Sequence, residues 1–129
     1  MDGGLMKKRI LIVDDEESYT DVLKINLEDT GAYEVQVAME APSGLALLEK
    51  NTYDVILLDI LMPKMEGHEA LEKIRKISKI PVIIMSSYIT PQQQSLVIKA
   101  GAASAFLKDQ PFDAIHSIIK RVIAGAAKA

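Results

Sequence analysis

Short aliphatic runs alternate with amphipathic stretches along the whole chain, and this alternation limits the possible folds more than any other feature. Some runs are continuous, short and rich in β-branched residues, as is typical of strands buried on both faces; they occupy residues 9–15, 54–59 and 81–85. Residues 33–38 alternate apolar with polar side chains, which predicts a strand with one wet face near a sheet edge. Residues 104–108 predict a short last strand.

Each predicted strand is followed by a stretch with the periodicity of a helix. These stretches are residues 18–31, 42–50, 67–77, 90–101 and 112–125. Repeated alternation of strand and helix predicts an α/β fold, in which a parallel sheet is covered by helices on both faces.

Local signals predict where helices begin and which of their side chains are buried. Ser18 and Thr90 are of the residue types that cap helix N-termini. The apolar residues predicted to face the core are Tyr19, Val22, Leu23 and Leu27 in the first helix, and Leu71, Ile74 and Ile77 in the third. Leu96, Val97 and Ile98 are consecutive, so they cannot all face the core.

Length and composition indicate one ordinary domain. The chain has 129 residues, which fits one domain. Its net charge of −3 argues against a basic nucleic-acid-binding face. The absence of cysteine excludes disulfides and thiolate metal sites. No apolar run reaches the roughly 18 residues of a membrane span, and the N-terminus lacks the apolar stretch of a signal peptide, so we expect a cytoplasmic protein. We divide the chain into a leader at 1–7, expected to be disordered, a domain at 8–124 and a tail at 125–129, either a frayed helix end or a linker.

Polar residues follow the predicted buried strands, where an aliphatic run should meet no charge. Asp14 and Asp15 follow the first strand, Asp59 the third, Ser86 the fourth and Lys108 the fifth. Functional groups of open parallel sheets collect beyond the carboxyl ends of the strands, where the strand order reverses. We therefore expect these side chains to share one edge of the sheet. The alternative, that each one marks where its strand meets water, fits such a convergence poorly.

This set of residue types suits phosphoryl transfer. Carboxylate oxygens are hard ligands, and Mg²⁺ typically binds one or two carboxylates in a protein. Clustered acidic residues repel one another unless a cation compensates their charge. A metal ion and Lys108 would together neutralise a transferring phosphoryl group. Asp14 and Asp15 form a pair suited to metal, which leaves Asp59 as the predicted acceptor.

Four short motifs, in this order and each at a predicted strand end, resemble those of response-regulator receiver domains of two-component signalling. They are VDDE at 13–16, LLDILMPKMEG at 57–67, PVIIMSS at 81–87 and AFLK at 105–108. The likeness runs from about Lys8 to Ala124. It implies a flavodoxin-like, doubly wound sheet of five strands in the order 2-1-3-4-5 with five helices.

The resemblance also implies a role for each motif residue. It makes Asp59 the acceptor of a phosphoryl group from a histidine-kinase phosphohistidine, and Lys108 and Ser86 the residues that bind that group. The implied Mg²⁺ ligands are Asp14, Asp15, Asp59 and the backbone carbonyl of Leu61. The expected partners are a sensor histidine kinase or phosphotransfer protein and a downstream protein, with no direct nucleic-acid or membrane binding. The domain would catalyse only its own phosphorylation and slow dephosphorylation, and so would not be a metabolic enzyme.

Two departures from the family pattern bear on switching. Ala105 occupies the place of the usual Tyr or Phe switch, while Phe106 is expected to point to the opposite face of the sheet. Asp109 follows Lys108 where many members have proline, so we expect no cis peptide bond there.

The sequence also allows comparison with other functions of the same fold. A degenerate receiver that only binds proteins is the main alternative. A flavin-binding module would need a hydroxyl- and glycine-rich phosphate loop where this chain has DDEES, and aspartyl phosphatases separate two acids that are adjacent here.

Overall fold

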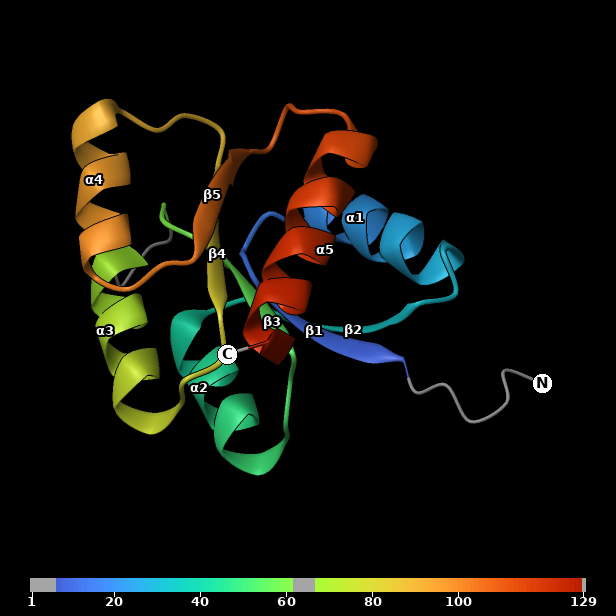
Figure 1. The fold of residues 1–129 in the computed structure, drawn as a ribbon, viewed down its shortest axis with the longest axis horizontal. Helices are drawn as coiled ribbons and strands as arrows, with labels where there is room; N and C mark the ends of the chain where they lie inside the picture. Colours follow the sequence, from blue (N-terminus) through green and yellow to red (C-terminus); the bar gives the residue numbers. More distant parts are fainter. Residues whose placement is uncertain (1–6, 62–66, 129) are drawn as a thin grey trace.

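The computed structural model describes residues 7–61 and 67–128. Strands and helices alternate in it as β1 (Lys8–Val13), α1 (Glu17–Asp29), β2 (Tyr33–Ala38), α2 (Ala41–Lys50), β3 (Val55–Asp59), α3 (Gly67–Ile77), β4 (Val82–Ser86), α4 (Pro91–Lys99), β5 (Ser104–Leu107) and α5 (Phe112–Lys128). The strands pair in parallel in the order β2-β1-β3-β4-β5 (Figure 1). The predicted flavodoxin-like fold class, its strand order and its five helices are confirmed.

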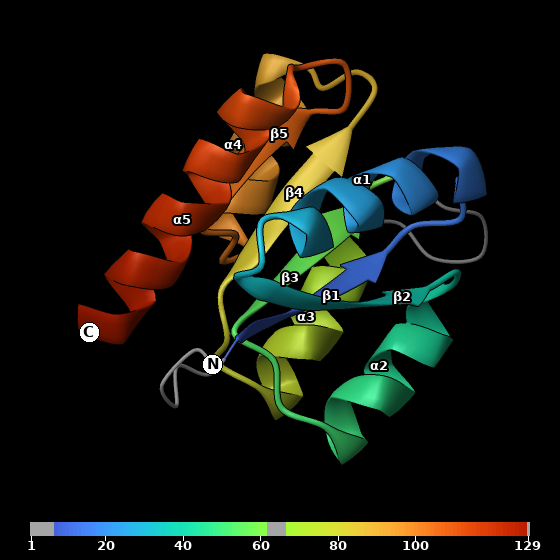
Figure 2. The ribbon, with the colours of Figure 1, turned by 90° about the vertical axis from the view of Figure 1, so that its right-hand side faces the viewer.

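The helices form a layer on each face of the sheet. Helices α1 and α5 pack over one face, where Leu23 and Ile119 join one apolar cluster with the strand side chains that point that way. Helices α2, α3 and α4 pack over the other face, where Leu48, Leu71 and Val97 join a second cluster (Figure 2). The sheet is therefore covered on both sides, as the strand–helix alternation predicts.

Burial along the strands follows their place in the sheet. All five residues of β3 and all five of β4 are buried because both faces of these inner strands are covered. In the edge strand β2, buried Tyr33 and Val35 alternate with exposed Glu34 and Gln36, as the sequence predicts. None of the helices within residues 7–61 and 67–128 is long and apolar enough to cross a membrane.

Two details of the first helix differ from the sequence prediction. Helix α1 begins at Glu17, so Glu16 and not Ser18 is its N-cap residue, and within the described chain the Glu16 side chain makes no capping hydrogen bond. The buried residues of α1 are Thr20, Leu23 and Leu27, whereas Val22 is 58% exposed. Because residues turn by 100° along a helix, Val22 lies roughly 130° from the centre of that buried stripe.

In the later helices the capping prediction is confirmed and one burial prediction is wrong. Thr90 caps α4 in a reciprocal pair with Gln93, since Thr90 Oγ1 accepts from the Gln93 backbone N–H at 3.1 Å and Gln93 Oε1 accepts from the Thr90 N–H at 2.9 Å. In α4, Leu96 and Ile98 are exposed and Val97 is buried. Ile77 was predicted to be buried but is 48% exposed, because it is the last residue of α3 and the chain turns away after it.

Helix α2 lies close against β1 at Gly44. A Cβ atom at this position would lie 2.8 Å from Cγ2 of Val13, closer than packed atoms approach. Glycine therefore allows α2 to pack closely against β1, the strand that Asp14 and Asp15 follow.

The reversal of strand order positions the candidate site. The chain passes from β1 to β2 on one side and then returns to β3 on the other side of β1. The segments that leave β1 and β3 therefore diverge at the carboxyl edge of the sheet and leave the ends of these strands accessible between them. The described residues contain no cis peptide bond, in line with the expectation for Lys108 and Asp109.

The proposed division of the chain stays a prediction. Of the predicted leader, residues 1–6 lie outside the described residues. Helix α5 extends to Lys128, so most of the predicted tail at 125–129 continues that helix.

Candidate functional site

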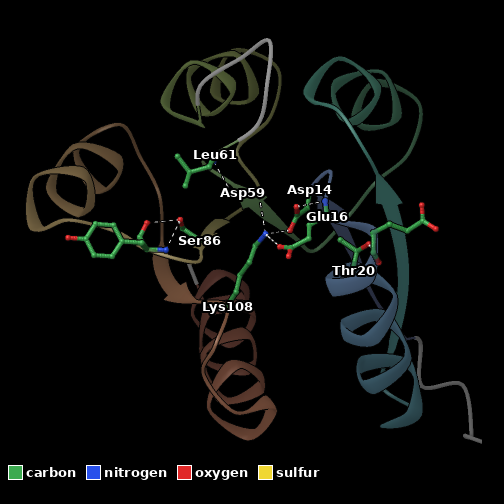
Figure 3. Close-up of polar contacts among 9 residues, drawn as sticks. Asp14, Glu16, Thr20, Asp59, Leu61, Ser86 and Lys108 are labelled. Atoms are coloured by element: carbon green, nitrogen blue, oxygen red, sulfur yellow. Dashed lines mark hydrogen bonds and ion pairs between the residues drawn. The ribbon is translucent and has the colours of Figure 1, made fainter.

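The ends of four strands bring the predicted site residues to one edge of the sheet. Asp14 follows β1, Asp59 is the last residue of β3, Ser86 is the last residue of β4, and Lys108 follows β5. Figure 3 shows Lys108 reaching across from the β5 end toward Asp59 and Asp14. Asp14, Asp59 and Ser86 are each at most 4% exposed, so this is a buried polar cluster at the end of an apolar sheet.

The Lys108 ammonium group lies among three carboxylates. Its Nζ is 2.7 Å from Asp14 Oδ2, 2.9 Å from Glu16 Oε1 and 3.2 Å from Asp59 Oδ2. The Lys108 side chain is only 7% exposed. A lysine this buried is stable only with charge partners, and its three N–H donors match the number of acidic groups around it.

Backbone N–H groups orient the two buried carboxylates. The Glu16 N–H donates to Asp14 Oδ1 at 2.9 Å, and the Leu61 N–H donates to Asp59 Oδ1 at 2.9 Å. In both residues, therefore, Oδ1 faces the loop that follows the strand and Oδ2 faces Lys108. Asp14 Oδ2 is held by the ion pair alone, because no described donor makes an aligned hydrogen bond to it.

The electrostatics of the cluster are those of charges removed from water. Burial raises the pKa of Asp59 from 3.8 to about 6; the Leu61 N–H opposes this shift, the Asp14 carboxylate adds to it and Lys108 opposes it. Burial by itself would lower the pKa of Lys108, but the close contacts with the carboxylates of Asp14, Glu16 and Asp59 outweigh burial and raise it. Lys108 therefore stays protonated at neutral pH, and the raised pKa of Asp59 means that it ionises less readily than an ordinary aspartate.

The acidic residues also fit a divalent cation. Asp14, Asp15 and Asp59 each offer a carboxylate oxygen, and these oxygens all lie within 4.8 Å of one another. Asp14 and Asp59 are buried while Asp15 is exposed, so the group opens to solvent on one side. All-oxygen ligands with room for waters suit Mg²⁺ better than a softer metal. Asp14 Oδ2, which accepts no aligned hydrogen bond from a described donor, has electron pairs that a cation could use.

The Ser86 hydroxyl group is turned toward its own loop. Ser86 Oγ donates to the Tyr88 carbonyl at 2.7 Å and accepts from the Tyr88 N–H at 3.3 Å. Figure 3 shows this pair of contacts beside Asp59 and on the side away from Asp14. A new acceptor at Asp59 would therefore compete with the Tyr88 carbonyl for the Ser86 proton.

The aromatic residue of β5 faces away from this loop. Ala105 pairs with Ile84 in the sheet and packs against the cluster under α2, α3 and α4, whereas Phe106 is 4% exposed in the cluster under α1 and α5. The opposite orientations of these neighbours were predicted from strand alternation and are confirmed.

Two residues at the site were not assigned a role from the sequence. Glu16 binds Lys108, and the Tyr19 ring centroid lies 5.0 Å from Lys108 Nζ, as in a cation–π contact. Burial raises the pKa of Tyr19 to about 12, and its hydroxyl has no hydrogen-bond partner among the described residues. The one local signal for Glu16 is a glutamate at a helix N-cap, where Ser, Thr, Asp and Asn are preferred.

The fold and this edge of the sheet define a class, namely flavodoxin-like domains with an acidic cluster and a lysine beyond the strand ends. The sequence profile of the response regulator receiver domain matches residues 10–120. The chain therefore belongs to the response regulator receiver domain family of two-component signalling.

Individual proteins agree with this assignment. The chain is 39% identical over 128 residues to a probable transcriptional regulator, ycf27, of Galdieria sulphuraria, covering 95% of this chain and 49% of that protein. It is 34% identical over 117 residues to the DNA-binding dual master transcriptional regulator RpaA of Synechocystis, covering 88% of this chain and 47% of RpaA. The chain thus spans about half the length of these curated relatives.

A solved structure shows the same fold at similar identity. The CheY-like response regulator receiver domain protein of Methanospirillum hungatei superposes with a TM-score of 0.88 and 33% identity, and the match covers 95% of this chain and 98% of that one.

Proposed function

We propose that this receiver domain accepts a phosphoryl group on Asp59 and changes its protein partners in response. The observation that carries the proposal is the contact between Lys108 Nζ and Asp59 Oδ2 at 3.2 Å, beside the Asp14 and Asp15 carboxylates. A nucleophile, a cation and a metal-binding acid pair at one strand end are the parts that phosphoryl transfer needs. A receiver domain that only bound other proteins would not require these three parts.

Each residue of the site has its own role in the proposed phosphoryl transfer. An Asp59 oxygen attacks phosphorus while the P–N bond of a phosphohistidine breaks, so the phosphoryl group becomes an acyl phosphate and the electron pair returns to the histidine nitrogen. Lys108 neutralises the charge on the phosphoryl oxygens. Asp14, Asp15, Asp59 and the Leu61 carbonyl would hold Mg²⁺, which would supply further positive charge. Accepting and slowly losing this group is the only catalysis proposed.

The Ser86 hydroxyl group provides the switch. A phosphoryl oxygen on Asp59 is a charged acceptor and forms a stronger hydrogen bond than the Tyr88 carbonyl that Ser86 now contacts at 2.7 Å. Moving the Ser86 proton to the phosphoryl group frees the Tyr88 carbonyl and rearranges the loop from Ser86 to Thr90. The rearranged loop and α4 would present a changed surface to a downstream protein.

The partners that we propose are a sensor histidine kinase or phosphotransfer protein upstream and a protein downstream. RpaA is named as a DNA-binding regulator, but the present chain matches 47% of its length. Direct nucleic-acid binding is not proposed for this acidic domain, and cytoplasmic placement stays a prediction.

Intact-mass spectrometry after treatment with phosphoramidate and Mg²⁺ tests the proposal. The wild-type chain should gain one phosphoryl group that is lost at alkaline pH, and Asp59→Asn should gain none. The matched control is Asp54→Asn, at the opposite end of β3, which should react like the wild type. Modification of Asp59→Asn at the wild-type rate would disprove the acceptor, and no modification of the wild type would favour the binding-only alternative.

A further inference from the structure

We infer that Glu16 is a positioning residue that keeps the Lys108 ammonium group at the site when Mg²⁺ binds. The inference rests on the proposed function for its consequence, a faster phosphoryl transfer, but its structural part concerns only Glu16 and Lys108. The two residues are 92 positions apart in the sequence and meet at 2.9 Å (Figure 3).

The three carboxylate partners of Lys108 differ in whether they could also bind a metal ion. Of its three carboxylate partners, Asp14 and Asp59 belong to the acidic group that fits a metal ion, and Glu16 does not. A divalent cation on Asp14 and Asp59 draws on the same oxygens as Lys108 and repels the ammonium charge. When those two carboxylates are shared with a cation, Glu16 is the partner left with its full charge.

The backbone of Glu16 is held in place on both sides. Its backbone N–H holds Asp14 Oδ1 at 2.9 Å, so the main chain at Glu16 is tied to the cluster. Its carbonyl accepts from the N–H groups of Tyr19 and Thr20, each at 3.1 Å, which ties it equally to the first turn of α1. The Glu16 carboxylate therefore projects from a constrained point and reaches Lys108 without a loop rearrangement.

The Glu16 side chain is directed at Lys108 and not at the N-terminus of its own helix. As the N-cap of α1, Glu16 makes no side-chain capping bond within the described chain, although a shorter polar residue at that position would. The Glu16 side chain is 51% exposed and is directed at a lysine that is 7% exposed. It thus contacts Lys108 from a partly exposed position, while the Tyr19 ring centroid lies 5.0 Å from the ammonium nitrogen.

The loss of Glu16 would change the position of the Lys108 ammonium group during the reaction. Without Glu16, a lysine repelled by the bound cation would turn toward solvent and meet the incoming phosphoryl group less often. The ion pair between Glu16 and Lys108 is partly exposed. Its loss should slow modification by about 5-fold, which corresponds to the upper end of the interaction free energies of exposed ion pairs.

The test uses the full chain, MgCl₂ and phosphoramidate. In the first arm, NMR detects the signal of the Lys108 ammonium protons. In the Mg²⁺-saturated wild type these protons should be protected from exchange with water, and in Glu16→Gln their signal should be lost. The matched control is Glu17→Gln, the same change at an exposed position one residue further on, which should keep them. Persistence of the protected signal in Glu16→Gln would overturn the inference whether or not the chain is phosphorylated.

The second arm is a double-mutant cycle on the modification rate. Glu16→Gln should slow the wild type by about 5-fold but change nothing in a Lys108→Ala background, because the effect passes through Lys108. Equal slowing in both backgrounds would mean that Glu16 acts on Mg²⁺ by charge alone. A faster reaction would mean that Glu16 withholds Lys108 from the phosphoryl group. Either result overturns the inference, whereas an unreactive wild type would instead contradict the proposed function.

Discussion

Replacing Asp59 with asparagine should stabilise the fold in the absence of Mg²⁺. Asp59 is 4% exposed, and its pKa is raised from 3.8 to about 6, chiefly by burial. A difference of about 2 pKa units corresponds to ~3 kcal/mol for holding the ionised group in the folded state. Asparagine has no charge to bury and can still accept the Leu61 N–H bond at Oδ1.

This figure already includes the attraction of Lys108, because the Lys108 charge opposes the rise in the pKa of Asp59. In the variant, Asp14 and Glu16 remain as charge partners of the ammonium group. The net expectation for Asp59→Asn is a gain of about 2–3 kcal/mol in the free energy of unfolding near neutral pH.

The sign of the pH dependence follows from the direction of the shift. A folded-state pKa above the unfolded value means that the folded state holds more protons between these two values. The contribution of Asp59 to the stability of the wild type therefore falls as pH rises from 3.8 to about 6 and stays at the lower level above that range. The advantage of Asp59→Asn should grow over the same interval and disappear below it.

Urea unfolding with EDTA, followed by circular dichroism at about pH 4 and about pH 8, measures this difference. Asp21→Asn, an exposed carboxylate on α1, is the control and should change stability little at either pH. Adding Mg²⁺ should stabilise the wild type more than Asp59→Asn, because binding to the folded state adds to stability. A variant that is less stable than the wild type at about pH 8, or equally displaced at both pH values, would refute the reasoning.

Three further predictions concern packing, capping and switching. Gly44→Ala should cost about 1–3 kcal/mol in urea unfolding because its Cβ would lie 2.8 Å from a methyl group of β1, whereas Gly125→Ala in α5, which meets no described atom within 4 Å, should be neutral or stabilising. Thr90→Ala should lower stability by about 1 kcal/mol and speed amide exchange at the start of α4; unchanged exchange there would contradict the capping role. On binding of a phosphate mimic, NMR shifts should concentrate in the loop at 86–90, and larger shifts around Ala105 would show that the reading of that position is wrong.

Periodicity and residue type alone determined much of this protein. The inner strands are short aliphatic runs because both of their faces are covered, and that pattern is local. The convergence of Asp14, Asp59, Ser86 and Lys108 could also be predicted, since parallel strands end at one edge of the sheet. The opposite orientation of Ala105 and Phe106 follows from the two-residue period of a strand.

Other features were decided only by tertiary structure. Val22 and Ile77 have the residue type of core positions, but both are about half exposed or more, at 58% and 48%. Val22 lies off the stripe of α1 that packs on the sheet, and Ile77 is the last residue of α3. Glu16 replaced Ser18 as the N-cap because the backbone leaving β1 is held by the Asp14 carboxylate, and α1 begins directly after it.

The partners of Lys108 are the clearest case. The sequence places an acid pair, one further acid and a lysine at strand ends, but it carries no measure of which oxygen each N–H group meets. Glu16 and Lys108 are separated by 92 positions, and their contact exists because β1 and β5 both end at the carboxyl edge of one sheet and the Lys108 side chain reaches across it. Periodicity reports which face a residue occupies, whereas the pairing of charges depends on distances between separate elements, and those distances are set by the packed sheet and helices together.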